Sequence, residues 1–186
     1  MIALCAASLL ACGAASAARL KTAVFAGGCF WSMEKAFEAT PGVTEAVSGY
    51  AGGTARAPTY EDHAGYLEAV KVTYDPDKVS YSQLVSAYFH HTDPTDGGGQ
   101  FCDRGESYRP AIFVADAPER AAAEAAKAAV GKALGRRIAT AVRPASSFYP
   151  AETYHQDFAR LHPARYEAYR IGCGRDAALR AVWAGR

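Results

Sequence analysis

Short apolar runs and stretches of alternating apolar and polar residues recur along this chain and predict β-strands. They cover residues 21–26, 43–50, 67–74, 111–115 and 137–142. Between the strands, helical periodicity and helix-start signals predict helices over residues 32–39, 81–91, 116–134 and 165–170. Because strands and helices do not alternate strictly, the predicted fold class is α+β, a two-layer sandwich with a ferredoxin-like (split βαβ) core and long ordered loops.

Two stretches interrupt this pattern. Residues 92–108 are rich in Gly and Asp, and a loop of this length in a compact domain is typically functional. Near the C-terminus, Ile171-Gly172-Cys173-Gly174 breaks the last predicted helix, so we expect a mobile C-terminal tail. No internal repeat or low-complexity linker divides the chain, which predicts a single catalytic domain over residues 19–186.

The overall composition excludes some classes of function. Half of the 186 residues are hydrophobic (50%) and 21% are charged, as in a soluble globular protein. The formal net charge of +1 provides no basic surface for nucleic acid. No apolar run after residue 18 is long enough to span a membrane, and a monomer is the default expectation.

The first 18 residues differ from the rest of the chain. They are rich in Ala and Leu, carry no charge and end in Ala15-Ser16-Ala17, which fits a signal-peptidase site. Leu9-Leu10-Ala11-Cys12 also resembles a lipobox, which would make Cys12 a lipid-bearing N-terminus. We therefore expect residues 1–18 to be an export signal, with a periplasmic protein as the product and lipid anchoring through Cys12 as a variant. The alternative interpretation is a buried N-terminal helix.

The stretch Gly27-Gly28-Cys29-Phe30-Trp31 carries the most informative chemistry. It follows a predicted strand and precedes a predicted helix, so Cys29 lies at a helix N-terminus. There the unpaired amides and the helix dipole stabilise an anion, and we expect a lowered pKa and a reactive thiolate. Phe30 and Trp31 add aromatic surface on which a small apolar group can bind. The alternative is an unreactive cysteine of the core.

Three residues are candidate partners of such a thiol. Glu68 lies at the start of a predicted strand, where partial burial would raise its pKa and let it donate a proton near neutral pH. Tyr50 and Tyr108 lie beside glycine-containing loops and could donate hydrogen bonds to a developing oxyanion. Taken one at a time, a solvated strand-end glutamate and two core tyrosines are the ordinary interpretations.

Removal of residues 1–18 leaves three cysteines, namely Cys29, Cys102 and Cys173. They form no C-x-x-C pair and match no structural zinc site, so no metal is expected. Cys173 lies between two glycines near the C-terminus, and a mobile cysteine there could condense with a sulfenic acid on Cys29 to form a disulfide. Cys102, in the glycine-rich loop beside Asp103, is a competing candidate for that step.

Several longer motifs occur in a fixed order between about Thr22 and Phe158. They are Gly28-Cys29-Phe30-Trp31, Pro41-Gly42-Val43, Ser48-Gly49-Tyr50-Ala51-Gly52-Gly53, Pro58-Thr59-Tyr60, Glu68-Ala69-Val70, Tyr74-Asp75-Pro76, His91-Thr92-Asp93-Pro94, Ser107-Tyr108-Arg109 and Phe148-Tyr149-Pro150-Ala151-Glu152. Together they resemble the peptide methionine sulfoxide reductase family that acts on the S epimer. Gly65-Tyr66-Leu67-Glu68 and Phe101-Cys102-Asp103-Arg104 depart from the residues usual in that family.

The resemblance implies a role for each site residue. Cys29 would be the nucleophile that attacks the sulfoxide sulfur, and Phe30 and Trp31 would bind the substrate methyl group. The sulfoxide oxygen would be bound and protonated by Glu68, Tyr50 and Tyr108. Asp103 would support the site by hydrogen bonds.

The resemblance also implies a reaction. The chain would be a thiol-dependent oxidoreductase that repairs oxidative damage by reducing the S epimer of methionine sulfoxide, free or in proteins, to methionine. The Cys29 sulfenic acid would form a disulfide with Cys173, and an external thioredoxin or another dithiol would reduce that bond. No bound cofactor is implied, whether metal, flavin or nicotinamide.

Two other classes of function remain open from the residues alone. A cysteine-dependent hydrolase or acyltransferase would pair Cys29 with His155 or His63, needs a carboxylate to orient the histidine, and has no use for Cys173. A non-catalytic module that binds a peptide or a metal needs no low-pKa thiol.

Overall fold

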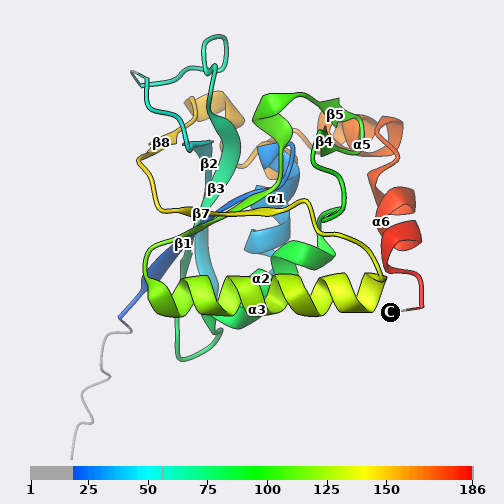
Figure 1. The fold of residues 1–186 in the computed structure, drawn as a ribbon. Helices are drawn as coiled ribbons and strands as arrows, with labels where there is room; N and C mark the ends of the chain where they lie inside the picture. The colour runs from blue at the N-terminus through cyan, green and yellow to red at the C-terminus, as the bar shows by residue number, and fades with distance from the viewer. Residues whose placement is uncertain (1–18, 56, 186) are drawn as a thin grey trace, which may run out of the picture.

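A computed structural model describes residues 19–55 and 57–185 of the chain. Its central element is a six-stranded sheet in the order β7-β6-β1-β3-β2-β8 (Figure 1). Neighbouring strands are antiparallel, except that β6 and β7 are parallel. The strands are β1 (Lys21–Ala26), β2 (Val43–Ala51), β3 (Leu67–Tyr74), β6 (Ala111–Val114), β7 (Ala141–Pro144) and β8 (Phe148–Pro150).

Helices α1 (Phe30–Glu38) and α2 (Tyr81–His90) complete a ferredoxin-like core. The chain follows β1-α1-β2-β3-α2-β6, and these four strands lie in the order β6-β1-β3-β2. Each helix therefore connects two strands that have one strand of the other half between them, which defines the split βαβ arrangement. The predicted α+β fold class and its ferredoxin-like core are confirmed.

Three aromatic rings join the two helices to the sheet. The Phe25 side chain of β1 is fully buried, and its ring stacks on Phe37 of α1 (4.9 Å between centroids) and on Tyr88 of α2 (5.5 Å). The Tyr88 hydroxyl donates to the Ala26 carbonyl at 2.9 Å, so this buried polar group is satisfied. Burial of these rings fixes α1 and α2 against β1.

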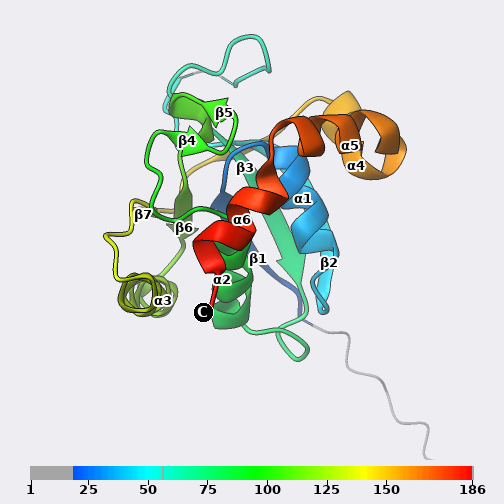
Figure 2. The ribbon, with the colours of Figure 1, turned by 90° about the vertical axis from the view of Figure 1, so that its right-hand side faces the viewer.

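The edge strands carry additional elements. Helix α3 (Ala117–Leu134) begins at Asp116, whose carboxylate accepts from the Glu119 amide at 2.8 Å, and ends at Gly135 with φ 62°. Figure 2 shows α3 end-on near the β6–β7 edge of the sheet. Strand β7 begins at Ala141 and not at residue 137 as predicted, and β8 forms in a segment that the sequence predicted to be a loop.

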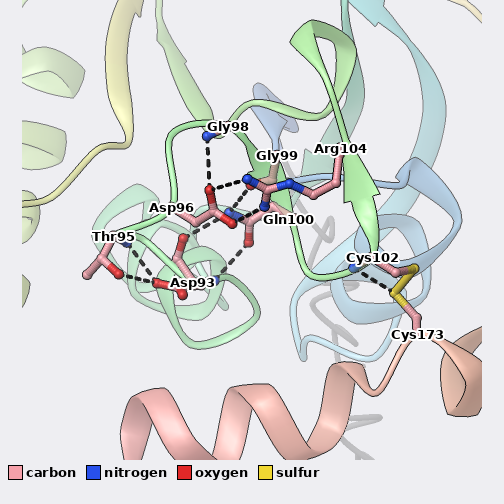
Figure 3. Close-up of polar contacts among 9 residues, drawn as sticks. All are labelled: Asp93, Thr95, Asp96, Gly98, Gly99, Gln100, Cys102, Arg104 and Cys173. Carbon is pink, nitrogen blue, oxygen red and sulfur yellow. Dashed lines mark hydrogen bonds and ion pairs between the residues drawn. A yellow bond between two sulfur atoms is a disulfide. The ribbon is translucent and has the colours of Figure 1, made fainter.

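The long irregular segment after α2 is ordered by its own side chains. It contains a small hairpin of β4 (Gly99–Gln100) and β5 (Asp103–Arg104), followed by the 3₁₀ turn η1 (Glu106–Tyr108). The buried Gln100 amide exchanges two hydrogen bonds of 2.8 Å with the Asp93 backbone, and Asp96 pairs with Arg104 (Figure 3). These contacts hold Cys102 at the turn of the hairpin.

The C-terminal segment is helical and packed, which corrects the predicted mobile tail. It forms the 3₁₀ turn η2 (Thr153–His155) and helices α4 (Phe158–Leu161), α5 (Pro163–Gly172) and α6 (Arg175–Trp183). Helix α6 lies across α1 and α2 (Figure 2): Arg175 is 4% exposed and donates to the His91 carbonyl at 2.7 Å, and Trp183 stacks on His90. Gly174, which the sequence analysis took as a break, has φ 63° and turns α5 into α6.

Within the described residues, no helix has the length and apolar character needed to cross a membrane. The expected export signal at residues 1–18 and the lipid anchor at Cys12 lie outside the described residues and stay predictions.

The turn between β1 and α1 depends on Gly28. Its φ is +80°, and a Cβ added there would lie 2.5 Å from the Gln100 Cβ. We expect Gly28→Ala to lower the free energy of unfolding by about 2–4 kcal/mol, the sum of a backbone cost and a steric clash. Urea unfolding measures this loss.

Gly65→Ala is the matched control for this substitution. Gly65 has φ +79°, but an added Cβ would meet no atom within 4 Å, so only the backbone cost of about 1 kcal/mol applies. If the free energy of unfolding falls equally in the two variants, Gln100 does not pack against the turn.

Candidate active site around Cys29

Cys29 lies where β1 ends and α1 begins, as the sequence predicted. It is the N-cap residue of α1, and its carbonyl accepts from the Ser32 amide at 3.1 Å. The residue is 6% exposed, and the Trp31 amide and the Tyr169 hydroxyl lie near its sulfur, where both lower its pKa. Cys29 therefore lies at the N-terminus of α1, and it is its carbonyl, not its sulfur, that accepts from the helix amides.

The pKa of Cys29 is nevertheless raised to about 12. Burial is the largest cause, because the thiolate loses its hydration, and the negative charges of Glu68 and Asp103 act in the same direction. The contacts with Tyr169 and the Trp31 amide lower the pKa but are outweighed. The predicted low-pKa thiolate is thus wrong for the structure described, and Cys29 is a thiol at neutral pH.

Glu68 is the buried acid of the site. It lies on β3 opposite Tyr50 of β2, is 2% exposed, and its Oε2 accepts from the Phe30 amide at 3.0 Å. Burial raises its pKa to about 8; the Phe30 amide opposes this shift and the charge of Asp103 adds to it. Glu68 is therefore protonated at neutral pH and can donate a proton, as the sequence predicted.

The tyrosine hydroxyls are arranged differently from the prediction. Tyr50 is fully buried and its hydroxyl donates to Glu152 Oε2 at 3.1 Å, while Glu152 Oε1 accepts from the Tyr60 amide at 2.8 Å. Tyr50 thus holds the Tyr60 loop in place and does not present a free hydroxyl donor. Burial raises the pKa of Tyr60 and of Tyr108, and the charges of Glu68 and Cys29 raise both further, so these two tyrosines also belong to the surroundings of the thiol.

Phe30 and Trp31 form an aromatic wall together with residues of the C-terminal third. The Phe30 ring is 4.9 Å from the His155 ring, and Trp31 stacks on Phe158 at 3.7 Å. The Trp31 indole donates to His155 Nδ1 at 3.1 Å. Burial lowers the pKa of His155, so this imidazole is neutral and accepts at Nδ1. Phe30 is 1% exposed, so the wall packs mainly against the protein itself, and the binding of a small substrate group there stays a prediction.

Helix α5 places Tyr169 over Cys29, a contact that the sequence analysis missed. The Tyr169 hydroxyl donates to Asp103 Oδ2 at 2.6 Å, and its oxygen contacts the Cys29 sulfur. Burial raises the pKa of both Tyr169 and Asp103. Cys29, Tyr169 and Asp103 therefore form a row, joined by the Tyr169–Asp103 hydrogen bond and by the proximity of Tyr169 to Cys29. The supporting role that the resemblance implies for Asp103 stays a prediction.

Cys102 and Cys173 form a disulfide, and Cys29 is free. The expected pairing of Cys173 with Cys29 is thus not the one in the structure; Cys173 is bonded to the competing candidate (Figure 3). Cys102 directly precedes Asp103, and the Cys173 amide donates to the Tyr169 carbonyl at 2.8 Å, one helical turn away. The disulfide therefore joins the two segments that carry Asp103 and Tyr169.

Cys102, Asp103 and Cys173 are also close enough to be considered as metal ligands, with their ligand atoms within 4.8 Å of one another. Both sulfurs are engaged in the disulfide, which leaves one carboxylate oxygen donor. One carboxylate is too few ligands for a zinc site. This cluster therefore fits thiol–disulfide chemistry and not metal binding.

Comparison with known proteins gives a result consistent with this geometry. The family model described as peptide methionine sulfoxide reductase matches residues 21–186. The chain belongs to this family. Its members are thiol-dependent oxidoreductases that reduce methionine sulfoxide.

Relatives in this family are similar over most of their length. The chain is 51% identical over 174 residues to "Peptide methionine sulfoxide reductase MsrA 2" of Rhizobium meliloti (strain 1021), covering 92% of this chain and 88% of that protein. Methionine sulfoxide reductase A of Corynebacterium diphtheriae has a similar structure, with TM-score 0.68, 33% identity, and coverage of 77% of this chain and 76% of that chain. Mxr1 from Saccharomyces cerevisiae, in complex with Trx2, shares the fold with TM-score 0.56, 22% identity, and coverage of 77% and 88%.

The alternative of a Cys–His hydrolase does not fit this family or the geometry. His155 Nδ1 is occupied by the Trp31 indole, and His63 Nδ1 lies 3.1 Å from the Thr59 carbonyl while its ring stacks on Tyr50. Within the described residues, neither histidine makes a hydrogen bond to Cys29. The side chain that lowers the pKa of Cys29 is that of Tyr169, not that of a histidine.

We expect iodoacetamide to alkylate Cys29 slowly at pH 8, because the raised pKa leaves very little thiolate. With residues 1–18 removed and the Cys102–Cys173 disulfide intact, Cys29 is the sole thiol. Its alkylation rate should be at least about 100-fold below that of free cysteine at pH 8 and should still be rising at pH 10. A rate that levels off below pH 9 would show that the helix N-terminus outweighs burial.

Proposed function

We propose that this chain reduces the S epimer of methionine sulfoxide, free or in proteins, to methionine. The observation that carries the proposal is Glu68, a buried and protonated carboxyl held by the Phe30 amide beside the Cys29 thiol. A sulfoxide sulfur becomes electrophilic when its oxygen receives a proton, and a neutral carboxyl next to a sulfur nucleophile supplies that combination. Phe30 and Trp31 provide the apolar surface for the substrate methyl group.

The row Cys29–Tyr169–Asp103 supports a route for the thiol proton. As the Cys29 sulfur attacks the sulfoxide sulfur, its proton passes through the Tyr169 hydroxyl to Asp103, and Glu68 protonates the oxygen. The protonated sulfoxide oxygen then transfers, as a hydroxyl group, from the substrate sulfur to the Cys29 sulfur. The products are methionine and a Cys29 sulfenic acid, so the methionine sulfur gains the two electrons that Cys29 loses.

Resolution of the sulfenic acid uses the other two cysteines. The Cys173 sulfur attacks the Cys29 sulfur, the hydroxyl of the sulfenic acid leaves as water with the proton of the Cys173 thiol, and the Cys29–Cys173 disulfide forms. Cys102 then attacks Cys173 and releases Cys29 as a thiol, which ends in the pairing present in the structure. A thioredoxin-type dithiol reduces that bond; the complex of yeast Mxr1 with Trx2 supports this type of partner.

Glu68 predicts the pH dependence of the reaction. Because only its protonated form donates, and its pKa is about 8, kcat/KM should fall as pH rises above 8. Glu68→Gln should lower kcat/KM by about 10²–10⁴-fold and abolish its fall above pH 8, since an amide cannot transfer a proton. Steady-state assays on the S epimer measure both effects.

Glu45→Gln, at an exposed position of β2, is the control. It should change neither kcat/KM nor the fall of kcat/KM above pH 8. A Glu68→Gln variant that keeps the wild-type rate, or the wild-type fall above pH 8, would overturn the assignment of Glu68 as the acid.

The thiol relay predicts how much methionine the reduced enzyme makes without any reductant. The first turnover ends in Cys102–Cys173 and a free Cys29, which can react once more, so wild type should yield about two methionines per chain. Cys102→Ser should yield about one, because its reaction ends at Cys29–Cys173. Rapid quench on the separated S and R epimers gives these counts, and the R epimer should give none.

One methionine from wild type as well as from Cys102→Ser would show that Cys102 does not accept the disulfide. Product from Cys29→Ser would overturn the proposed nucleophile.

A further inference from the structure

The Cys102–Cys173 disulfide lies at the surface, next to unusual apolar exposure. Cys102 is exposed and Cys173 is half-buried. Ile171, two residues before Cys173, is 71% exposed, the highest value among the large hydrophobic side chains that the structure describes. A shallow cavity of about 220 Å³ adjoins it between α5 and α6, lined by Arg170, Ile171, Gly174, Asp176, Ala177 and Arg180. We call this region the Ile171 surface.

The two sulfurs of the disulfide are not chemically equivalent. The Cys102 amide donates to Cys173 Sγ at 3.1 Å, whereas Cys102 Sγ lies 3.8 Å from Asp103 Oδ1. An amide donor stabilises a thiolate on Cys173, and a neighbouring carboxylate disfavours one on Cys102. In disulfide exchange the better-stabilised sulfur leaves and the other sulfur is attacked. Cys173 is therefore the preferred leaving group, and the exposed Cys102 is the preferred target.

The hairpin that carries Cys102 is fixed independently of the disulfide. Gln100 is buried and bonded to the Asp93 backbone, and Asp96 pairs with Arg104 (Figure 3). Cys102 thus keeps its place at the surface when its bond to Cys173 breaks. A rigid target lets an approaching thiol align with the S–S bond.

We propose that a thioredoxin-type dithiol protein docks on the Ile171 surface and attacks Cys102 Sγ. The inference rests on the proposed function, because it identifies the sulfur and the surface used in the recycling step. The reductant thiolate bonds to Cys102, the Cys102–Cys173 bond breaks, and Cys173 leaves as a thiolate that takes a proton from water. The second thiol of the reductant then displaces Cys102, so two electrons pass to the chain and the reductant becomes a disulfide.

The surroundings of the disulfide offer contacts that a protein dithiol can use. Arg170 at the edge of the surface is paired with Glu167 and Asp176, so its charge is neutralised within the chain. The exposed Ile171 and the adjoining glycines Gly172 and Gly174 then offer apolar and sterically open contacts beside the reactive bond. An apolar rim around the partner's cysteine fits this surface. A second cysteine in the partner is required, since one thiol alone would leave Cys102 in a mixed disulfide.

A single-cysteine thioredoxin, in which the second active-site cysteine is replaced by Ser, traps the intermediate. The reduced chain is oxidised with methionine sulfoxide, and a non-reducing peptide map first records its disulfide. The trapping thioredoxin is then added, and the reaction is stopped with acid at early times. We expect the mixed disulfide on Cys102 at least tenfold more often than on Cys173, whereas a majority on Cys173 would overturn the assigned target. If the peptide map made before thioredoxin is added shows only the Cys29–Cys173 disulfide, the proposed relay is contradicted. This result distinguishes failure of the relay from failure of the assigned target.

The docking surface is tested by Ile171→Glu, with Leu161→Glu as the matched control. Leu161 is 55% exposed and precedes the opposite end of α5, a helix length away from Ile171. We expect Ile171→Glu to lower kcat/KM for thioredoxin about tenfold relative to the rate supported by dithiothreitol, which needs no docking. Leu161→Glu should leave this ratio unchanged. Equal ratios in both variants and wild type would overturn the surface assignment.

Discussion

The hydrogen bond from the Phe30 amide to the buried Glu68 carboxyl is the contact on which the rest of the site depends. It joins the first turn of α1 to β3 at 3.0 Å, and so it fixes the helix N-terminus, with Cys29 as its cap, beside the acid. The helix amide alone would favour the ionised carboxylate, but burial outweighs it and raises the pKa to about 8. The same packing therefore places the acid and keeps it protonated.

The same competition decides the state of Cys29. A helix N-terminus lowers a thiol pKa, yet here full burial and two nearby carboxyl groups raise it to about 12. A buried neutral thiol beside the aromatic wall is a poor target for general oxidants and alkylating agents, because the thiolate is the reactive form. In the proposed reaction, reactivity then depends on a substrate that can accept the proton of Glu68, which would couple activation of Cys29 to binding of a sulfoxide.

The sequence predicted those parts of the structure that local signals determine. Alternation and capping residues identified the ferredoxin-like core, and the strand-turn-helix around Gly28 correctly placed Cys29. Three features could not be read locally. Burial, which reversed the sign of the Cys29 pKa shift, depends on how segments distant in sequence pack together, which local patterns do not report. Tyr50 pairs with Glu68 across the strands, but its hydroxyl donates to Glu152, 102 residues later in the chain.

The third feature is the partner of Cys173. The glycines on either side of Cys173 suggested mobility, but Gly174 turns α5 into a packed α6, and this turn directs Cys173 toward the hairpin that carries Cys102. Sequence distance gives no information on such a pairing, since 71 residues separate the two cysteines. The available signal was the departure from the usual family residues at Phe101-Cys102-Asp103-Arg104. It made Cys102 a candidate for the thiol relay but did not identify it as the partner of Cys173.

The most direct test of this account is the titration of the Glu68 carboxyl carbon by ¹³C NMR, with Glu68→Gln used to assign its signal. The account predicts a single transition near pH 8, with the neutral carboxyl present at pH 7. A transition near the ordinary glutamate value of about 4.3 would mean an ionised carboxylate at neutral pH. Such a carboxylate could not protonate a sulfoxide, and the central claim would be wrong.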